Sequence, residues 1–274
     1  MRKDPLELRE PRPPRTTGDR WFAGSAGSGA AIRLVCFAHA GGTPSLFRDW
    51  SAHLGPDLLV APVLLPGRGI RLSEPAWTDI GMLAREVATA VVEQAAPGRY
   101  AMFGHSMGAL LAYEVACVLR DRGAPAPEHL FVSGSRAPHL YGTPLGAELP
   151  DDRLLAWVRA LNGSHSGARS YFDRRLPTLR ADLRACENYH PRPRPPLDCS
   201  LTIFSAAGDL VVDTEHSDQW LSYTTGPVRR SHFPGGHFYL AGPHRFRLLH
   251  EIRDELARHT TALGSTVPPA IAEG

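Results

Sequence analysis

Residues 100–112 read YAMFGHSMGALLA, and this stretch decides the fold. The mostly apolar residues 100–103 are typical of a buried strand, and residues 107–122 have the composition of a helix. Between them Gly104, Ser106 and Gly108 match the pattern G-x-S-x-G, in which a serine lies on a sharp turn between a strand and a helix. The two glycines leave space for the neighbouring strand and helix, so we expect Ser106 to be presented as a nucleophile.

Short apolar runs and helical patterns alternate on both sides of this turn. Strands that alternate with helices indicate a mostly parallel sheet with helices on both faces, which is an α/β fold. A left-handed residue is expected at Gly123, where the helix after Ser106 should end. Besides 100–103, we expect strands at residues 32–38, 58–65, 129–133, 201–204 and 228–233. Besides 107–122, we expect helices at residues 80–91, 215–223 and 244–259.

The regular alternation breaks at residues 137–197, which we interpret as a helical lid inserted into the core. This interval holds two amphipathic helix candidates, at residues 153–161 and 176–189. A chain of 274 residues fits one α/β domain with such an insertion. The expected order is a flexible leader at 1–20, the core at 21–136, the lid at 137–197, the rest of the core at 198–259 and a flexible tail at 260–274.

The composition excludes several classes of protein. Thirty basic and 28 acidic residues give a net charge of +2, which argues against a dedicated nucleic-acid binder. The sequence has neither an apolar run of about 18 residues nor an apolar segment near its N-terminus, so we expect a soluble cytoplasmic protein with no membrane contact. The four cysteines are scattered without a C-x-x-C pair, which predicts neither disulfides nor a metal site, and no cofactor is expected.

A serine hydroxyl needs a base within hydrogen-bond reach and a third group that orients that base. In proteins with this kind of turn the chain order is serine, acid, histidine. His237 follows the last predicted strand in a loop with Gly235 and Gly236, so it is the expected base. Asp209 is the first carboxylate after strand 201–204 and is the expected acid, with Asp213 as a rival that is better suited to start the next helix.

The tetrahedral intermediate of acyl transfer needs two backbone N–H groups that stabilise its oxyanion. Met107 directly follows the serine and supplies one of them. The loop after the first strand, His39-Ala40-Gly41-Gly42, supplies the other, for which Ala40 is the best candidate. His39 precedes the order of serine, acid and histidine, so a structural role for its ring is favoured over a catalytic one.

Six short motifs follow one another along the chain: Phe37-Ala38-His39-Ala40-Gly41-Gly42, Leu65-Pro66-Gly67-Arg68, Gly104-His105-Ser106-Met107-Gly108-Ala109, Ser133-Gly134-Ser135-Arg136-Ala137-Pro138, Leu179-Arg180-Ala181-Asp182 and Pro234-Gly235-Gly236-His237-Phe238-Tyr239-Leu240. This ordered set resembles the stand-alone type II thioesterases of polyketide and non-ribosomal peptide biosynthesis, which belong to the α/β-hydrolase superfamily. The resemblance implies a helical lid and hydrolysis of aberrant or stalled acyl groups from the phosphopantetheine arm of acyl or peptidyl carrier proteins. It also makes Asp209 the equivalent of the triad acid. Ala38 and Ala206 depart from the proline and glycine frequent in the family, which affects loop geometry alone.

Two further groups of residues are candidates for binding. Apolar and aromatic residues of the insertion are expected to shape an acyl pocket, with simple packing on the core as the alternative: Trp157, Leu161, Tyr171 and Phe172. Arginines are expected to dock an acidic carrier protein onto a monomeric enzyme, with a solvated face as the alternative: Arg68, Arg169, Arg174 and Arg175.

Three other functions remain open at this point. A small-molecule carboxylesterase or lipase shares the triad but typically lacks the motifs at Arg68 and at residues 179–182. A non-catalytic receptor can share the fold, although an intact set of serine, acid and histidine speaks against it. A cyclising, chain-terminating thioesterase is generally joined to a synthase.

Overall fold

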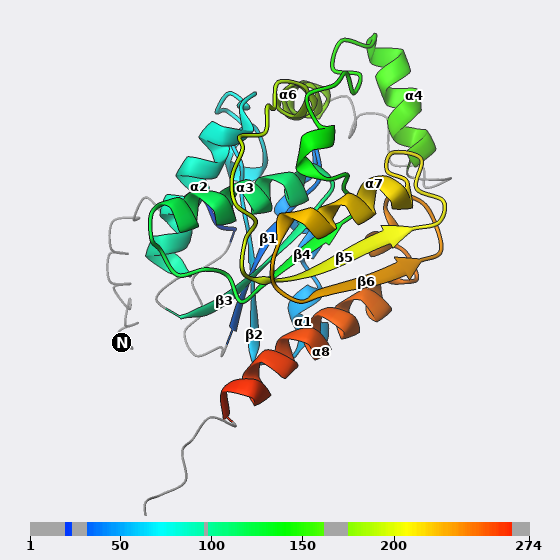
Figure 1. Ribbon diagram of the computed structural model, residues 1–274. Coiled ribbons are helices and arrows are strands. Elements are labelled where there is room, and N and C mark those ends of the chain that lie inside the picture. Colours follow the sequence, from blue (N-terminus) through cyan, green and yellow to red (C-terminus); the bar gives the residue numbers. More distant parts are fainter. Residues whose placement is uncertain (1–19, 24–31, 96–97, 162–174, 265–274) are drawn as a thin grey trace, which may run out of the picture.

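The computed structural model describes residues 20–23, 32–95, 98–161 and 175–264 of this chain. The six strands of the described residues form one parallel sheet in the order β2-β1-β3-β4-β5-β6 (Figure 1). The strands are β1 (Ile32–Phe37), β2 (Leu58–Pro62), β3 (Arg99–His105), β4 (His129–Ser133), β5 (Ser200–Ala206) and β6 (Val228–Phe233).

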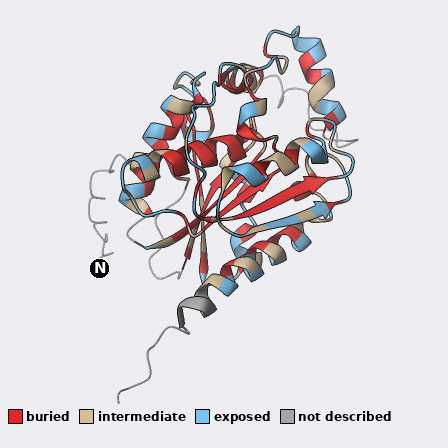
Figure 2. Cartoon of the chain, viewed as in Figure 1, coloured by how far each residue is buried: buried red, intermediate tan, exposed pale blue. Residues whose placement is uncertain are grey.

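Helices cover both faces of the sheet, as predicted. One face carries α2 (Ile80–Gln94), α3 (Met107–Asp121) and α7 (Thr214–Asp218), and the other carries α1 (Trp50–Leu54) and α8 (Arg245–Gly264) (Figure 1). Figure 2 shows that the buried residues follow the strands and the sheet-facing sides of these helices. The core therefore consists of two apolar layers with the sheet between them.

Successive residues of each strand contribute to these two layers in turn. In β1, Leu34 and Cys36 pack with α1 and α8, whereas Val35 and Phe37 pack with α2 and α3. Phe131 of β4 faces α8 in the same way. Because side chains alternate across a strand and both faces are covered, most positions of the inner strands are apolar, whereas β6 at the sheet edge carries exposed residues, among them Arg229 and Arg230. This is why the sequence shows continuous apolar runs instead of an alternation of apolar and polar residues.

The insertion between β4 and β5 contains α4 (Asp151–Leu161) and α6 (Leu176–Glu187), close to the helices expected at 153–161 and 176–189. Leu154 and Leu155 of α4 pack with Leu176 and Leu183 of α6 in a small separate core. Both helices lie beyond one end of the sheet (Figure 1). The insertion thus has packing of its own and covers the strand ends where the motifs lie.

Several predicted boundaries differ from the structure. The helix expected at 215–223 is α7 followed by a separate 3-10 helix, Gln219–Tyr223, and α8 ends at Gly264 instead of 259. The strand expected at 58–65 ends at Pro62. Helix α1 was not predicted, because five residues are too few to show a helical period. Gly123 is left-handed as predicted, with φ of +65°.

Two further observations bear on the class of protein. All four cysteines are free and buried. No helix within the described ranges combines the length and the apolar character needed to cross a membrane.

The glycines around Ser106 permit a close approach between elements. A Cβ atom on Gly108 would lie 2.2 Å from the Phe37 carbonyl oxygen, and one on Gly104 would lie 2.3 Å from the Gly108 carbonyl oxygen. Backbone atoms cannot move aside as the end of a flexible side chain can. The N-terminus of α3 therefore packs directly on β1 and β3 only because these positions are glycine.

We predict that Gly108→Ala lowers the free energy of unfolding by about 1–3 kcal/mol, the usual cost of overpacking. The gain of about 1 kcal/mol in helix propensity is too small to offset the clash. Urea unfolding measures the effect. Gly98→Ala is the matched control, because its Cβ would have its nearest neighbour, the Ala95 carbonyl oxygen, 4.0 Å away. Equal unfolding midpoints for Gly108→Ala and wild type would contradict the proposed constraint.

Candidate active site

Ser106 lies on the turn between β3 and α3 in a strained backbone conformation. Its φ of 56° and ψ of −122° make it the one residue other than glycine, within the described ranges, that has a positive φ. Its N–H donates to the Ser133 carbonyl oxygen at 2.8 Å. Such strain costs about 1–3 kcal/mol and persists where the surroundings enforce it. The backbone thus holds the Ser106 hydroxyl at the carboxyl edge of the sheet.

Asp209 and His237 form a buried pair in two neighbouring loops. Asp209 Oδ2 lies 2.8 Å from His237 Nδ1, and the two side chains are 1% and 3% exposed. The other carboxylate oxygen accepts the N–H groups of Val211 at 2.8 Å and Val212 at 3.1 Å. Because a carboxylate can only accept, Nδ1 carries the proton, and in the neutral ring Nε2 holds the lone pair.

Close contact between glycines holds these two loops together. Gly208 donates its N–H to the Gly235 carbonyl oxygen at 2.8 Å, and a Cβ on Gly208 would lie 2.9 Å from that oxygen. Gly235 has a φ of +102°, which an L-residue rarely adopts. This contact holds the loop after β6 against the loop after β5, and His237 therefore lies next to Asp209.

Asp213, the rival acid, has a different place. It is the N-cap of α7, and its side chain accepts the N–H of His216 at 2.8 Å. Its side chain is 62% exposed. The structure therefore brings Asp209 to the histidine, while Asp213 begins the next helix.

The backbone N–H groups of Ala40 and Met107 belong to residues that line one cavity with Ser106 and His237. Met107 is the first residue of α3, and the first N–H groups of a helix have no acceptor within it. Ala40 lies in the loop after β1, next to Gly41, which has a φ of +70°. Both predicted N–H donors therefore belong to the same cavity wall as the serine.

Two histidines beside this pair were not assigned a catalytic role from the sequence. His105 is fully buried; its Nδ1 lies 3.0 Å from Ser133 Oγ, which in turn lies 2.5 Å from the Tyr239 hydroxyl. Burial, followed by the nearby His237 and His39, holds the pKa of His105 well below its usual range. Burial also lowers the pKa of His39 to about 3, with further contributions from His237, Arg68 and Arg175. Both rings are neutral at neutral pH, so they add no positive charge beside His237.

The cavity has a volume of about 330 Å³ and a mostly apolar wall. Trp157 and Leu161 line it, as expected from the sequence, but Arg169, Tyr171, Phe172 and Arg174 lie outside the described residues. Helices α4 and α6 supply a large part of the apolar wall: Leu155, Trp157, Val158, Leu161, Leu176, Leu179, Leu183 and Cys186. The insertion thus forms one side of the cavity and the turn at Ser106 the other.

The expectation that Arg68 docks a carrier protein is wrong. Its side chain is 5% exposed, and its guanidinium forms a bidentate pair with Asp182 at 2.9 and 2.7 Å. A buried, paired arginine offers no charge to a protein surface. Arg175, by contrast, is half-buried and lines the cavity.

Comparison with known proteins gives consistent matches. A family model described as a thioesterase domain matches residues 32–256. Thioesterase PikA5 of Streptomyces venezuelae is 37% identical over 84% of this chain and 81% of its own length. The RedJ thioesterase from the prodiginine pathway of Streptomyces coelicolor is 53% identical, covering 86% of this chain and 97% of its own, with a TM-score of 0.78. The type II thioesterase BorB from the borrelidin cluster is 34% identical, covering 88% and 100%, with a TM-score of 0.80. These structures confirm the predicted α/β-hydrolase fold.

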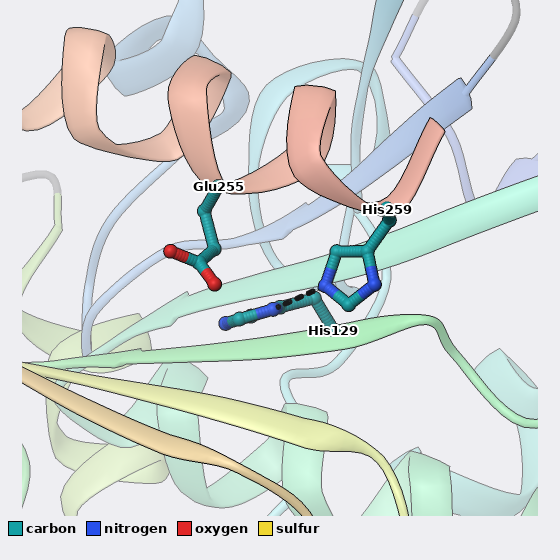
Figure 3. A group of neighbouring side chains, drawn as sticks. All are labelled: His129, Glu255 and His259. Atoms are coloured by element: carbon teal, nitrogen blue, oxygen red, sulfur yellow. Dashed lines mark hydrogen bonds between the residues drawn. The ribbon is translucent and has the colours of Figure 1, made fainter. Parts of the chain in front are cut away.

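A separate cluster, formed by His129 of β4 with Glu255 and His259 of α8, has ligand atoms close enough to hold a metal ion (Figure 3). His129 Nδ1 lies 3.0 Å from His259 Nε2, however, and its Nε2 lies 2.8 Å from Thr202 Oγ1. Glu255 already pairs with two arginines, Arg229 at 2.9 Å and Arg258. A cation bound at Glu255 would therefore face both guanidinium groups. We therefore assign these side chains to the attachment of α8 to the sheet.

The pKa of His129 predicts an acid-dependent loss of stability. Burial, together with the charges of His259, Arg258 and Arg229, lowers this pKa to about 3 in the folded protein, against about 6.5 in an unfolded chain. Between these values the unfolded state binds a proton that the folded state does not, so stability falls by up to about 1.4 kcal/mol per pH unit as pH decreases.

The measurement is urea unfolding of wild type and His129→Gln from pH 7.5 to pH 4.5. The stability difference between them should shrink as pH falls below about 6.5, because the variant lacks the titrating group. The exposed His250 provides the control, since His250→Gln should leave the pH dependence unchanged. If the free energy of unfolding of wild type and of His129→Gln depends on pH in the same way, the pKa of His129 is not lowered in the folded protein.

Proposed function

The chain belongs to the thioesterase family, and we propose that it is a type II thioesterase that hydrolyses acyl groups from the phosphopantetheine arm of carrier proteins in polyketide or non-ribosomal peptide biosynthesis. The observation that carries this proposal is the buried Asp209–His237 bond of 2.8 Å beside an apolar cavity that both His237 and Ser106 line. All three relatives named above are thioesterases by their names, and RedJ and BorB belong to the prodiginine pathway and the borrelidin biosynthetic cluster.

In the proposed reaction, Ser106 Oγ attacks the carbonyl carbon of the acyl thioester while His237 Nε2 accepts the hydroxyl proton. The C–S bond then breaks, the acyl group remains on Ser106, and His237 returns the proton to the departing sulfur. Water attacks the acyl-serine by the same route and releases the free acid. Asp209 fixes the Nδ1–H tautomer of His237 and stabilises the imidazolium formed in each step.

The oxyanion of each tetrahedral intermediate would be stabilised by the N–H groups of Ala40 and Met107. Removal of one such donor typically costs about 3 kcal/mol of transition-state stabilisation. The low-polarity wall around these groups strengthens their effect, since electrostatic interactions weaken in water. Ala40 and Met107 would therefore account for a large part of the rate.

The apolar wall supplied by α4 and α6 suits the acyl chain of the substrate. We assign the insertion at 137–197 the role of a lid, because its helices line the cavity and supply a large part of the apolar wall. Among the described residues, the arginines that line the cavity are Arg136 and Arg175. Their positive charge is suited to attract the phosphodiester of the pantetheine arm. The arm must enter the cavity mouth to bring the thioester to Ser106.

A panel of carrier proteins loaded with different acyl groups tests this function. Release of acid should be faster from an acyl carrier than from the same acyl group on p-nitrophenol at equal concentration. Faster turnover of the p-nitrophenyl esters, with no release from any carrier, would identify a small-molecule esterase instead.

We predict that Ser106→Ala and His237→Ala each lower kcat for thioester hydrolysis by about 10⁴-fold or more. The double variant should lose little beyond either single variant, because the two groups act as a unit. Steady-state kinetics with an acyl-pantetheine substrate gives the values, and near-UV circular dichroism checks that each variant is folded. Additive losses in the double variant would mean that the two residues act independently.

We predict a large difference between the two aspartates. Asp209→Asn should lower kcat by about 10⁴-fold, because an amide can hold His237 in the wrong tautomer and cannot stabilise the imidazolium. Asp213→Asn should be nearly neutral, since asparagine caps a helix as well as aspartate does. If Asp213→Asn is the more damaging change under the same assay, Asp209 is not the acid.

A further inference from the structure

A buried ion pair joins the insertion to the core beside the cavity. Asp182 of α6 is fully buried, and Arg68 in the loop after β2 is 5% exposed. Arg68 donates from one terminal nitrogen to Asp182 Oδ2 at 2.9 Å and from the other to Oδ1 at 2.7 Å. Bidentate pairs of this kind fix orientation as well as distance.

The same two side chains also bind the loop that contains Ala40. Asp182 Oδ2 accepts the N–H of Gly41 at 2.7 Å, and Arg68 donates to the carbonyl oxygen of Gly42 at 3.1 Å. A Cβ on Gly41 would lie 3.2 Å from the Leu179 Cβ, so α6 packs directly on this loop. The charged side chains of Asp182 and Arg68 therefore hold the loop at the two residues that follow Ala40.

Stability alone does not account for this arrangement. Burying two charges costs several kcal/mol per ion, and well-packed apolar residues of similar volume usually give equal or higher stability. The pair does, however, hold the peptide between Ala40 and Gly41 through a short bond to the N–H of Gly41. This peptide shares the Cα of Ala40 with the preceding peptide, which carries the Ala40 N–H. A fixed backbone position is what an N–H donor to an oxyanion requires.

We propose that Arg68 and Asp182 are positioning residues that set the Ala40 N–H for the oxyanion, and that the docked helix α6 completes the oxyanion hole through them. This inference rests on the proposed acyl-enzyme chemistry at Ser106. It makes the insertion part of the catalytic geometry as well as a wall of the cavity: when α6 is in place, the loop after β1 is in place.

The test is the double variant Arg68→Met with Asp182→Leu, which removes both charges together and leaves no unpaired ion. Its kcat for an acyl-pantetheine should fall roughly 10- to 100-fold with KM little changed, because a displaced donor weakens the transition state alone. The rate at which a fluorophosphonate labels Ser106 should fall as well, since that reaction also develops charge on an oxygen in the oxyanion hole. A folded double variant with wild-type kcat and labelling rate would overturn the proposal.

A second buried pair provides the matched control. Arg194 lies 3.0 Å from Glu114, with side chains 13% and 7% exposed. The double variant Arg194→Met with Glu114→Leu removes charges in the same way at a distance from the loop after β1. Its kcat and labelling rate should equal those of wild type per folded molecule. Equal losses in both double variants would attribute the effect to general destabilisation and overturn the positioning role.

Asp182→Asn keeps the proposal testable where the double variant does not fold. An asparagine oxygen can still accept the N–H of Gly41, so its kcat should lie between that of wild type and that of Asp182→Ala, per folded molecule. Equal kcat values for Asp182→Asn and Asp182→Ala would overturn the positioning role. Fluorophosphonate labelling does not depend on which thioester the enzyme serves. Normal labelling without thioester hydrolysis would therefore count against the proposed function and leave this inference to be decided by the labelling rates of the variants.

Discussion

The close approach of α3 to β1 and β3 fixes the turn that carries Ser106. Gly104 and Gly108 allow backbone contacts that a Cβ atom would prevent, and the helix N-terminus that they place holds Ser106 at a positive φ. The N–H of Met107 then points out of the first turn of α3 without an acceptor in the helix. One packing constraint therefore fixes both the position of the hydroxyl and one of the two proposed donors to the oxyanion.

Two buried carboxylates of the site are held by hydrogen bonds in apolar surroundings. Asp209 is bound by two N–H groups and His237, and Asp182 by Arg68 and Gly41. Buried networks of this kind are stronger than the same bonds in water, and each unpaired member would be costly. We thus propose separate roles for the two carboxylates: Asp209 orients the histidine, and Asp182 of α6 holds the loop after β1.

The sequence predicted the sheet and the sharp turn at Ser106 because each depends on a local pattern, whereas the order of serine, acid and histidine was expected from the rule for proteins with such a turn. The apolar run at Ile32–Phe37 and the glycines beside Ser106 are of this kind. The burial of Arg68 depends instead on a partner 114 positions away in the chain, and an isolated arginine offers no sign of it. The motifs around Arg68 and Asp182 were both recognised, and their joint presence was the available signal that the two side chains meet. The Ser133–Tyr239 contact beside His105 likewise exists only in the folded chain.

In the proposed mechanism, the acyl group is bound covalently to Ser106 before water releases it. Rapid mixing of the protein with an acyl-pantetheine, an acid quench and peptide mass spectrometry measure this directly. We expect the peptide that contains Ser106 to gain the mass of the acyl group at times shorter than one turnover. The same peptide of Ser106→Ala should gain no mass. Acid release at the full rate with no acyl group on Ser106, or with the acyl group on another residue, would contradict it.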